Sequence, residues 1–362
     1  MDVRRIGKTL REGSLVAWFW VDVDNPPQAQ YLSPIATGLR NRGHSVLITA
    51  RNHQPTLDVL ANRGETATPV GDPFGETTAA KVAGTLKRAA NLHRLAKRTL
   101  GRPAAVVSTS RSGVLAARTL RAPCFTVLDY EGVELGIFRR SGTTILHPAV
   151  VPASVFVERG FPTERLVAFP GLKEDLSFSG LDIGSVQPAK FSFTGSNSRS
   201  IVLVRPPSET SHYRVDDSMR MLDLVIDRLA GSDELQVVFA PREPEQLRIL
   251  ESRDWRVPPV VLSKPLPLVE LLTGVDCVVT GGGTMLREAA WLGVQGVTLF
   301  QGEMPAVDTW LESEGAIRRV GGAKDIDEIQ WHRTSRSNVI AHHPEALDRV
   351  VEIVLEGASK GR

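Results

Sequence analysis

Two blocks of alternating short and long segments constrain the fold of this chain more than any other feature. Short apolar runs rich in β-branched residues alternate with amphipathic segments. The runs are apolar at nearly every position, which is typical of parallel strands covered by helices on both faces. Strands are predicted at residues 15–21, 45–49, 104–108, 124–128, 143–146, 201–204, 235–239, 259–262, 276–280 and 296–300. Because βαβ units recur in two blocks, we predict an α/β fold with two Rossmann-like, doubly wound domains that face each other across a cleft.

The length supports this division, because 362 residues exceed one ordinary domain of about 100–150 residues. The alternating pattern lapses between residues 171 and 200, and Ser, Gly and Lys are frequent after residue 189. A flexible tail is therefore predicted at 1–14, an N-terminal domain at 15–170, a linker or hinge at 171–200 and a C-terminal domain at 201–362.

Cysteine and hydropathy patterns exclude several protein classes. The two cysteines, Cys124 and Cys277, each lie in an apolar run, so a disulfide framework is excluded and a reducing, cytoplasmic location is expected. No ligand spacing typical of zinc occurs, so no metal site is predicted. No run of about 18 apolar residues occurs, so no transmembrane helix is predicted.

The formal net charge of +2 is unevenly distributed. The stretch from Thr77 to Leu128 holds ten Lys and Arg residues and no Asp or Glu. A nucleic-acid-binding protein would be more uniformly basic, so nucleic acid is not an expected partner. The local excess of positive charge indicates an anionic small ligand, an acidic partner or a membrane surface.

Much of this charge falls on one predicted helix at about residues 78–100. One interpretation is a solvated helix whose leucines face the core. The other is a helix that docks on the anionic inner face of a membrane, at about 1 kcal/mol for each basic residue near the lipid. The residues concerned are Lys87, Arg88, Arg94, Lys97 and Arg98.

The clearest candidate for a binding site is a glycine-rich turn between a predicted strand and a helix. Gly281, Gly282 and Gly283 precede Thr284, and Glu288 lies one turn into the helix. Glycines let a ligand approach the backbone, and a helix N-terminus offers unpaired N–H groups to a diphosphate. Glu288 could accept hydrogen bonds from sugar or ribose hydroxyls. The alternative is a tight turn with a solvated glutamate.

Two arginines also follow predicted strands of the C-terminal block. Arg205 and Arg242 could converge on one phosphate cluster, because guanidinium groups match phosphate geometry. Alternatively, each pairs with a nearby glutamate or a carbonyl. His212 lies in the loop after Arg205, where a solvated histidine is more common than a catalytic one.

Carboxylates follow two predicted strands of the N-terminal block. Asp22 and Asp24 could act as a general base or bind acceptor hydroxyls. Asn25 is expected to cap the helix that begins near Pro26. Farther along, Asp129 and Glu131 flank an aromatic residue and could provide acid–base chemistry or hold a sugar; the alternative is a capping turn.

These motifs together resemble an uncharacterised prokaryotic family that is similar to UDP-N-acetylglucosamine 2-epimerases and to lipid-linked glycosyltransferases of the GT-B fold. The resemblance extends from about residue 15 to residue 320. The motifs that carry it are Asp22-Val-Asp-Asn-Pro-Pro, Gly43-His44, Thr49-Ala-Arg51, Asp129-Tyr-Glu131, Gly171-Leu-Lys-Glu174, Val204-Arg-Pro206 and Gly281-Gly-Gly-Thr-Met-Leu-Arg-Glu-Ala-Ala290.

The resemblance implies an acceptor side in the N-terminal domain and a nucleotide-sugar side in the C-terminal domain. The nucleotide-sugar would be a substrate, and no cofactor is implied. The turn from Gly281 to Thr284 would hold the diphosphate, and Glu288 a ribose or sugar hydroxyl. A final helix that packs back on the first domain would also fit.

The chain departs from the epimerase pattern at two places. Such epimerases carry an acidic residue in the loop that corresponds to Ser108–Gly113, which here has no carboxylate. They also carry a His-Arg-Arg-Glu-Asn motif where this chain has Arg205-Pro-Pro-Ser-Glu, without histidine unless His212 substitutes. Glu131 does match an acidic residue of their Val-Glu-Ala-Gly motif. Phosphate-binding features with fewer proton-transfer groups favour sugar transfer over epimerisation.

We therefore expect a metal-independent GT-B-like glycosyltransferase acting on a lipid-linked or polysaccharide acceptor. Arg205, Arg242 and the glycine turn would bind the donor, and Asp22, Asp24 or Glu131 would deprotonate the acceptor. Closure about the predicted hinge would exclude water. The first alternative is a nucleotide-sugar 2-epimerase that uses Glu131 and His212. The second is a non-catalytic protein that binds a nucleotide-sugar.

Overall fold

The computed structural model describes residues 17–75, 77–99, 101–193, 198–207, 215–264, 266–332 and 340–360. The chain forms two compact units. The first comprises residues 1–180 and 343–362, and the second comprises residues 181–342. The tail predicted at 1–14 lies outside the described residues.

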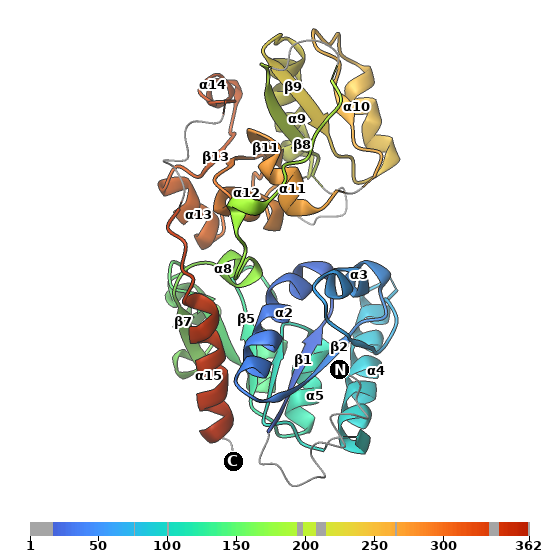
Figure 1. The fold of residues 1–362 in the computed structure, drawn as a ribbon, viewed down its shortest axis with the longest axis vertical. Helices are drawn as coiled ribbons and strands as arrows, with labels where there is room; N and C mark the ends of the chain where they lie inside the picture. Colours follow the sequence, from blue (N-terminus) through green and yellow to red (C-terminus); the bar gives the residue numbers. More distant parts are fainter. Residues whose placement is uncertain are drawn as a thin grey trace. The chain divides into compact units, whose positions relative to one another are not determined.

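The first unit is built on a seven-stranded parallel sheet with the order β3-β2-β1-β4-β5-β6-β7 (Figure 1). Its strands are β1 (Trp18–Val23), β2 (Ser45–Ala50), β3 (Thr68–Pro69), β4 (Ala105–Ser108), β5 (Cys124–Val127), β6 (Thr144–Pro148) and β7 (Leu166–Phe169).

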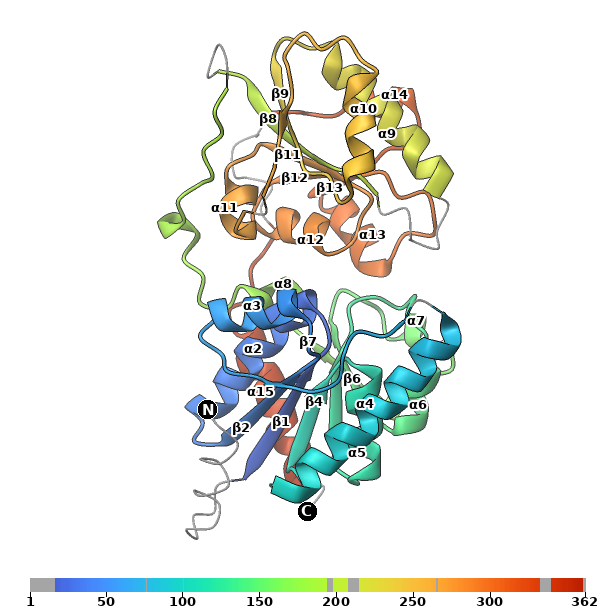
Figure 2. The same ribbon diagram turned by 90° about the vertical axis from the view of Figure 1, so that its right-hand side faces the viewer.

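Helices cover both faces of this sheet, with α2 and α15 on one face and α4, α5 and α6 on the other (Figure 2). The helices are α2 (Pro26–Asn41), α3 (Gln54–Asn62), α4 (Thr78–Thr99), α5 (Arg111–Thr119), α6 (Gly136–Ser141), α7 (Ser154–Val157), α8 (Lys173–Ser177) and α15 (Ala346–Lys360), with a 3₁₀ turn η1 (Thr163–Arg165). Coverage on both faces explains why every residue of β1 and β2 is buried.

The first strand–helix connection follows the sequence prediction. The Asn25 side-chain oxygen accepts a hydrogen bond from Gln28 N at 3.0 Å, and Pro26 and Pro27 occupy the first turn of α2. Pro suits that position because its missing N–H would have no helical partner there. The predicted cap and helix start are confirmed, and they bring the end of β1 directly to the start of α2.

The second unit is built on a six-stranded parallel sheet with the order β10-β9-β8-β11-β12-β13. Its strands are β8 (Ser200–Arg205), β9 (Leu235–Phe239), β10 (Val260–Val261), β11 (Cys277–Thr280), β12 (Gln295–Thr298) and β13 (Ile317–Arg319). The helices are α9 (Val215–Ala230), α10 (Arg248–Glu251), α11 (Leu268–Thr273), α12 (Thr284–Trp291), α13 (Ala306–Ser313) and α14 (Ala323–Asp327), with 3₁₀ turns η2 (Ile183–Ser185) and η3 (Pro244–Leu247).

The two sheets therefore share one topology. In each, the chain builds three strands outward in one direction and then crosses back to build the others on the opposite side of the first strand. This is the doubly wound Rossmann order, so the predicted fold class is confirmed.

The boundary between the units differs from the prediction of a linker at 171–200. Residues 173–177 form α8, whose side chains are all buried, and the first unit continues to Gly180. This short helix packs on α2, and its one apolar residue, Leu176, joins the core, which the local sequence pattern did not indicate. α15, at the end of the chain, belongs to the first unit, where Val350 and Val354 join the core cluster that contains β1.

Candidate functional site

Each sheet has one place where its strand order reverses, between β1 and β4 in the first unit and between β8 and β11 in the second. In open parallel sheets, ligands bind beyond the carboxyl ends of the strands at this reversal. The residues that follow these strands are therefore the candidates for each unit.

In the second unit, Arg205 and Thr280 stand side by side at the reversal. They are register partners and the last residues of β8 and β11. The Thr280 hydroxyl is buried and makes no hydrogen bond within the part of the chain that the structure describes. A buried hydroxyl without a partner is costly. This edge of the sheet therefore has unsatisfied hydrogen-bonding capacity next to a cationic side chain.

The glycine turn follows Thr280 directly. Gly282 and Gly283 have φ values of +93° and +85°, which side chains other than glycine rarely adopt. A Cβ at Gly281 would lie 3.1 Å from Pro207, whereas a Cβ at Gly283 would have no atom within 4 Å. Packing therefore requires glycine at 281, and backbone conformation requires it at 283. The space around the Cβ position of Gly283 is open.

The turn leads into α12 without a side-chain cap. Gly283 is the N-cap residue, no side chain accepts from the first turn, and the first turn contains no acidic residue. The N-terminal N–H groups of a helix carry a partial positive charge and point toward an approaching anion. In this eight-residue helix they begin at Thr284.

Arg242 extends the same positive region. Its Nε donates to the Pro206 carbonyl oxygen at 3.0 Å, and its backbone N–H donates to the Gln246 side chain at 2.8 Å. Desolvation and the nearby charge of Arg205 lower the pKa of Arg242, and Glu243 acts in the opposite direction. Desolvation also lowers the pKa of Arg205. The two guanidinium groups are therefore close enough to repel each other.

Two further predicted residues of the second unit are placed differently. Glu288 is buried, with 4 % of its surface exposed, so its carboxylate presents little surface to a ligand hydroxyl in this structure. His212 lies outside the described residues.

In the first unit, Asp22 lies at the reversal but is fully enclosed. Arg88 donates from Nη2 to Asp22 Oδ1 at 2.7 Å and from Nη1 to Oδ2 at 3.0 Å, and Thr49 donates to Oδ1 at 2.6 Å. The Asp22 and Arg88 side chains are 0 % and 1 % exposed. This carboxylate cannot meet an acceptor hydroxyl, so the expectation that Asp22 acts as a general base is replaced by a structural role.

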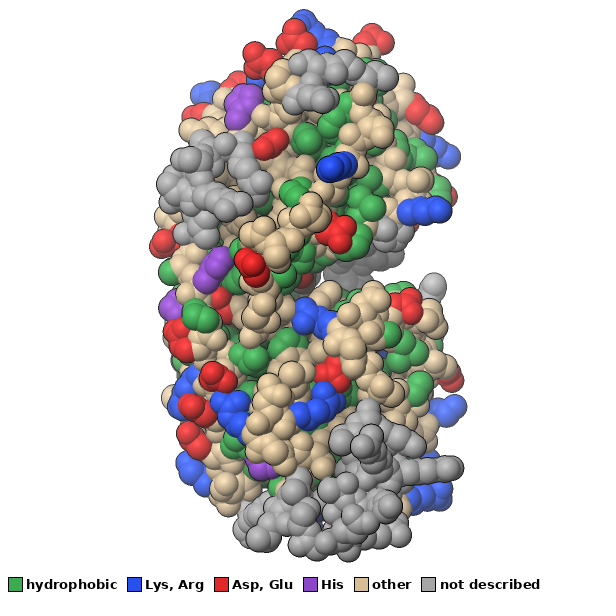
Figure 3. All heavy atoms as spheres, viewed as in Figure 1, with side chains coloured by type: hydrophobic (Ala, Val, Ile, Leu, Met, Phe, Trp, Pro, Cys, Tyr) green, Lys and Arg blue, Asp and Glu red, His purple; other side chains and the backbone are tan. Residues whose placement is uncertain are grey.

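Because of this pair, Arg88 is not part of the basic surface that was predicted for α4. Arg88 points into the first unit, where its Nε also donates to the Val70 carbonyl oxygen at 2.8 Å. Lys87, Arg94, Lys97 and Arg98 are exposed. Figure 3 shows Lys and Arg side chains at the edge of the first unit along which α4 runs in Figure 1.

Asp24 is more accessible than Asp22 but is also paired. Arg51 donates to its carboxylate from Nε at 2.9 Å and from Nη2 at 2.5 Å, and Arg88 Nη1 lies 3.6 Å from Oδ1. The Arg51 guanidinium also lies 3.9 Å from the ring centroid of Phe74. Because Arg51 and Arg88 already hold this carboxylate, Asp24 is better suited to binding than to proton abstraction.

A second polar cluster joins the ends of β4, β5 and β7. Lys173 at the start of α8 lies 2.6 Å from Asp129 Oδ2 and 3.6 Å from Glu174 Oε1. The Tyr31 hydroxyl donates to Thr109 Oγ1 at 3.0 Å, and burial raises the pKa of Tyr31 to about 12. The sequence predicted Asp129 here but not Lys173, because residues 173–177 were assigned to a linker, and it did not single out Tyr31 of α2.

Glu131 lies in the turn after β5, two residues beyond Asp129, and is half-buried. Tyr130 shapes the turn, because a Cβ at Gly132 would lie only 2.1 Å from the Tyr130 hydroxyl oxygen. Glycine at 132 lets the Tyr130 ring fold over the turn.

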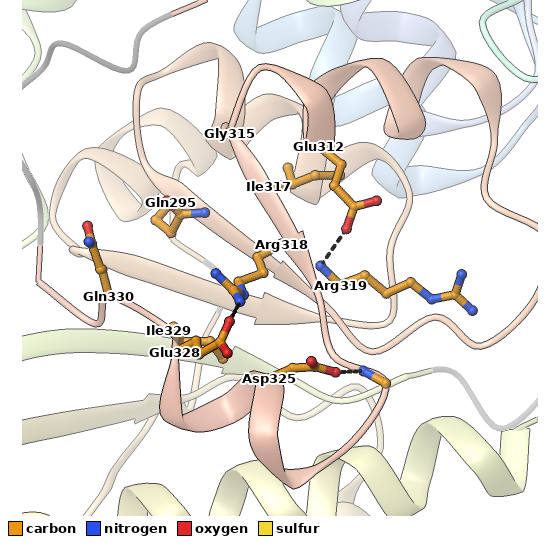
Figure 4. Close-up of a pocket in the computed structure, with 11 residues that line it drawn as sticks. Gln295, Glu312, Gly315, Ile317, Arg318, Arg319, Asp325, Glu328, Ile329 and Gln330 are labelled. Carbon is orange, nitrogen blue, oxygen red and sulfur yellow. Dashed lines mark hydrogen bonds and ion pairs between the residues drawn. The ribbon is translucent and has the colours of Figure 1, made fainter.

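A further pocket of about 590 Å³ lies beside the edge strand β13 (Figure 4). The side chains of its arginines already have partners: Arg318 forms an ion pair with Glu328, and Arg319 Nη2 donates to the Gly302 carbonyl oxygen at 3.2 Å. Strand β13 is at the outer edge of the sheet, away from the reversal at β8 and β11. We therefore do not assign the binding site to this pocket.

The described ranges were also compared with the requirements of a metal site, a reactive thiol and a membrane-spanning helix. They contain no group of three or more His, Cys, Asp or Glu side chains that could hold a metal ion. Burial raises the pKa of Cys124 to about 12 and raises that of Cys277 as well, so neither is a reactive thiolate. No helix in those ranges is long and apolar enough to cross a membrane.

Solved structures with the same architecture include enzymes of two kinds. The UDP-GlcNAc 2-epimerase of Neisseria meningitidis bound to UDP-GlcNAc matches with a TM-score of 0.68 and 14% identity, over 94% of this chain and 100% of that one. The glycosyltransferase SnogD of Streptomyces nogalater matches with a TM-score of 0.50 and 18% identity, over 96% and 98%. At these identities the likeness establishes the GT-B-like fold.

Among curated proteins, an uncharacterised protein of Methanocaldococcus jannaschii is 22% identical over 311 residues, which cover 85% of this chain and 89% of that protein. A family model described as "Protein of unknown function (DUF354)" matches residues 18–357, so the chain belongs to that family.

Proposed function

We propose that this protein is a GT-B-type glycosyltransferase that moves a sugar from a nucleotide-sugar donor to a lipid-linked or polysaccharide acceptor. One observation carries the proposal. Arg205 and Arg242, two guanidinium groups that repel each other, lie beside an open glycine turn and an uncapped helix at the sheet reversal. An anion with two phosphates would relieve the repulsion and satisfy the helix N–H groups.

The same groups suit the departing diphosphate of a transfer reaction. As the sugar–phosphate bond breaks, negative charge grows on the diphosphate oxygens, and donors fixed in place stabilise that charge without rearranging. The N-terminus of α12 adds a favourable term of about 0.3–1 kcal/mol. Arg242 is held by Pro206 and Gln246, so little ordering is needed when the anion binds.

A transferase also needs a base for the acceptor hydroxyl. We assign this role to Glu131, because it is half-buried in the turn that follows β5, at the carboxyl ends of the strands. Asp22 is enclosed by Arg88, and the Asp24 carboxylate is held by Arg51. Asp129 is unsuited for the same reason, since Lys173 lies 2.6 Å from it. The Lys173–Asp129 pair would instead bind hydroxyl groups of the acceptor.

The alternative is a nucleotide-sugar 2-epimerase. The observation that favours it is the high TM-score of the Neisseria enzyme. The observation against it is the loop after β4, where Ser108 and Ser110 serve the buried Asp22–Arg88 pair and no carboxylate is available. An enzyme that removes and returns a proton at one carbon needs two such groups.

A panel of UDP-sugars, incubated with the protein without an acceptor, separates these functions. Slow release of UDP supports the transferase, and an isomerised sugar supports the epimerase. Stabilisation against heat without either product supports a binding protein. The variants Arg205→Gln and Arg242→Gln should abolish the response, whereas Arg248→Gln, an exposed arginine on α10, should not. No binding of any nucleotide-sugar would overturn the proposal.

We further propose that α4 contacts an anionic membrane where the acceptor is found. Its exposed residues form one face at 100° per residue, and Val82 and Leu86 on that face are 56 % and 57 % exposed. Apolar side chains beside basic ones are typical of helices that lie on membrane surfaces. The basic residues are Lys87, Arg94, Lys97 and Arg98.

Sedimentation with phosphatidylglycerol vesicles tests this contact. The protein should pellet with these vesicles and not with neutral phosphatidylcholine vesicles. Charge reversal at Lys87 and Arg94 should reduce pelleting, and Leu86→Asp should reduce it without changing a basic residue. Pelleting that is independent of lipid charge would contradict the proposal.

A further inference from the structure

The acid-free stretch from Thr77 to Leu128 supplies a second basic region besides α4. Three of its arginines, together with one from η1, line a pocket of about 790 Å³ in the first unit. These are Arg102, Arg118, Arg121 and Arg165. No Asp or Glu is among the residues that line the pocket.

This pocket lies at the end of the sheet opposite to the candidate active site. Its lining residues come just before strands: Arg102 precedes β4, Pro123 precedes β5, Gly142 precedes β6 and Arg165 precedes β7. Because the strands are parallel, their amino ends share one edge, away from Asp129 and Glu131 at the carboxyl ends. The pocket is thus separate from the proposed site of sugar transfer.

Three of the four arginine side chains in the lining have no partner among the residues that the structure describes. The side chains of Arg118, Arg121 and Arg165 make no hydrogen bond or ion pair with those residues. Glu164 adjoins Arg165 in sequence but is not part of the lining. Like charges that line one hollow disfavour each other, and an anion with several oxygens would offset the positive charge of these three guanidinium groups.

Two backbone features also fit the binding of a ligand. Arg121 has a φ of +55° and is the one non-glycine residue with positive φ in the described ranges. This left-handed residue ends α5, where Gly or Asn is more usual, and it places the Arg121 side chain in the pocket lining. Gly142, with φ of +80°, leaves room for Arg165, because a Cβ there would lie 3.3 Å from its Nη1.

From these features we infer that the pocket at the amino ends of β4–β7 binds a phosphate-bearing anion. Guanidinium groups match phosphate oxygens in pairs, and four of them suit a group with two or more negative charges. The phosphate could come from a soluble metabolite or from a lipid headgroup. The inference does not depend on the proposed transferase activity, because it concerns the opposite edge of the first sheet.

Calorimetric titration with inorganic pyrophosphate tests the pocket. Because pyrophosphate could also bind near Arg205, the titration is done on the Arg205→Gln/Arg242→Gln background. In this background we expect one binding site, with a Kd at least ~10-fold weaker after Arg118→Gln/Arg165→Gln, since one charge-assisted bond is worth about that factor. Arg159→Gln, a matched exposed arginine of the first unit outside the pocket, should leave the Kd unchanged.

Vesicle sedimentation with the original arginines at 205 and 242 separates the two sources of phosphate. If a lipid headgroup is the ligand, Arg118→Gln/Arg165→Gln will lower pelleting with phosphatidylglycerol vesicles, and pyrophosphate will compete. If the ligand is soluble, pelleting will not change although pyrophosphate binding is lost. Equal pyrophosphate affinity with and without the pocket arginines would overturn the inference and leave the transferase proposal untouched.

Discussion

The guanidinium of Arg88 and the carboxylate of Asp22 form a two-point ion pair in the interior of the first unit, with N–O distances of 2.7 and 3.0 Å. The pair connects α4 to the central strand β1. Gly113 makes room for it, because a Cβ there would lie 2.6 Å from Asp22 Oδ2. The Ser110 hydroxyl oxygen accepts a hydrogen bond from Arg88 Nη1 and another from the Gly113 N–H in the first turn of α5.

Removing Arg88 should destabilise the first unit strongly. In Arg88→Met the Asp22 carboxylate would stay buried without its countercharge, which costs about 3–5 kcal/mol of unfolding free energy. Arg94→Met, on the exposed side of the same helix, should change it by less than about 0.5 kcal/mol. Urea unfolding followed by circular dichroism measures both. The double variant Asp22→Asn/Arg88→Met should recover part of the loss, and equal losses in both would show that the pair is not coupled.

The turn at Gly283 should respond to a single methyl group through the backbone alone. Its φ of +85° and ψ of −156° lie in a region that is nearly restricted to glycine, and a Cβ would meet no atom within 4 Å. Gly283→Ala should therefore lower stability by about 1–3 kcal/mol through strain. It should also weaken UDP binding, measured by titration calorimetry, because the turn would shift.

Gly180 offers the matched control, since it has a φ of +76° and open space around its Cβ position. Gly180→Ala should lower stability by a comparable or smaller amount and leave UDP binding unchanged. If Gly283→Ala binds UDP as tightly as the unmodified protein, the turn does not contact the nucleotide.

The interior strands of both sheets could be predicted from sequence, and the strands that were missed are at sheet edges. β3 is two residues long and includes Pro69, β13 ends in Arg318 and Arg319, and β7 is largely half-buried or exposed. An edge strand is covered incompletely, so its sequence need not be apolar at every position. The continuous apolar runs that identify interior strands are therefore absent at these positions.

The candidate site was predictable where it depends on the residues next to a strand, and not where it depends on distant contacts. The glycine turn and Arg205 follow from local sequence. The contact of Lys173 with Asp129 joins residues 44 positions apart, and the burial of Arg88 by Asp22 joins residues 66 positions apart. No spacing rule within one helix indicates which of several basic residues turns inward to meet such a partner.

The buried phenol of Tyr31 should make stability fall at alkaline pH. Burial raises its pKa from 10 to about 12, so the folded state holds this proton more tightly than the unfolded state does. The resulting stability is complete below pH 10 and is lost as the pH rises from 10 to 12, by about 1.4 kcal/mol per pH unit. Between pH 9 and pH 11, urea unfolding of the unmodified protein should therefore lose about 1.4 kcal/mol more than that of Tyr31→Phe.

Tyr31→Phe also removes the hydrogen bond from the Tyr31 hydroxyl to Thr109. This loss changes the free energy of unfolding by the same amount at every pH below 10. Absorbance at alkaline pH provides an independent measurement, because one of the three tyrosines should ionise late and disappear from the titration in Tyr31→Phe. Parallel pH profiles for the two proteins would contradict the assignment.

Glu131 is the carboxylate whose removal should affect catalysis without affecting donor binding. If it takes the acceptor proton, Glu131→Gln should lower kcat by about 10²–10⁴-fold. KM for the donor should change little, because the groups assigned to the diphosphate belong to the second unit. Glu134→Gln in the same loop, whose Oε1 accepts from Gly136 N, should keep nearly full activity. If Glu131→Gln keeps its kcat while Asp24→Asn loses it, the base is Asp24, and the Arg51 pair must open during the reaction.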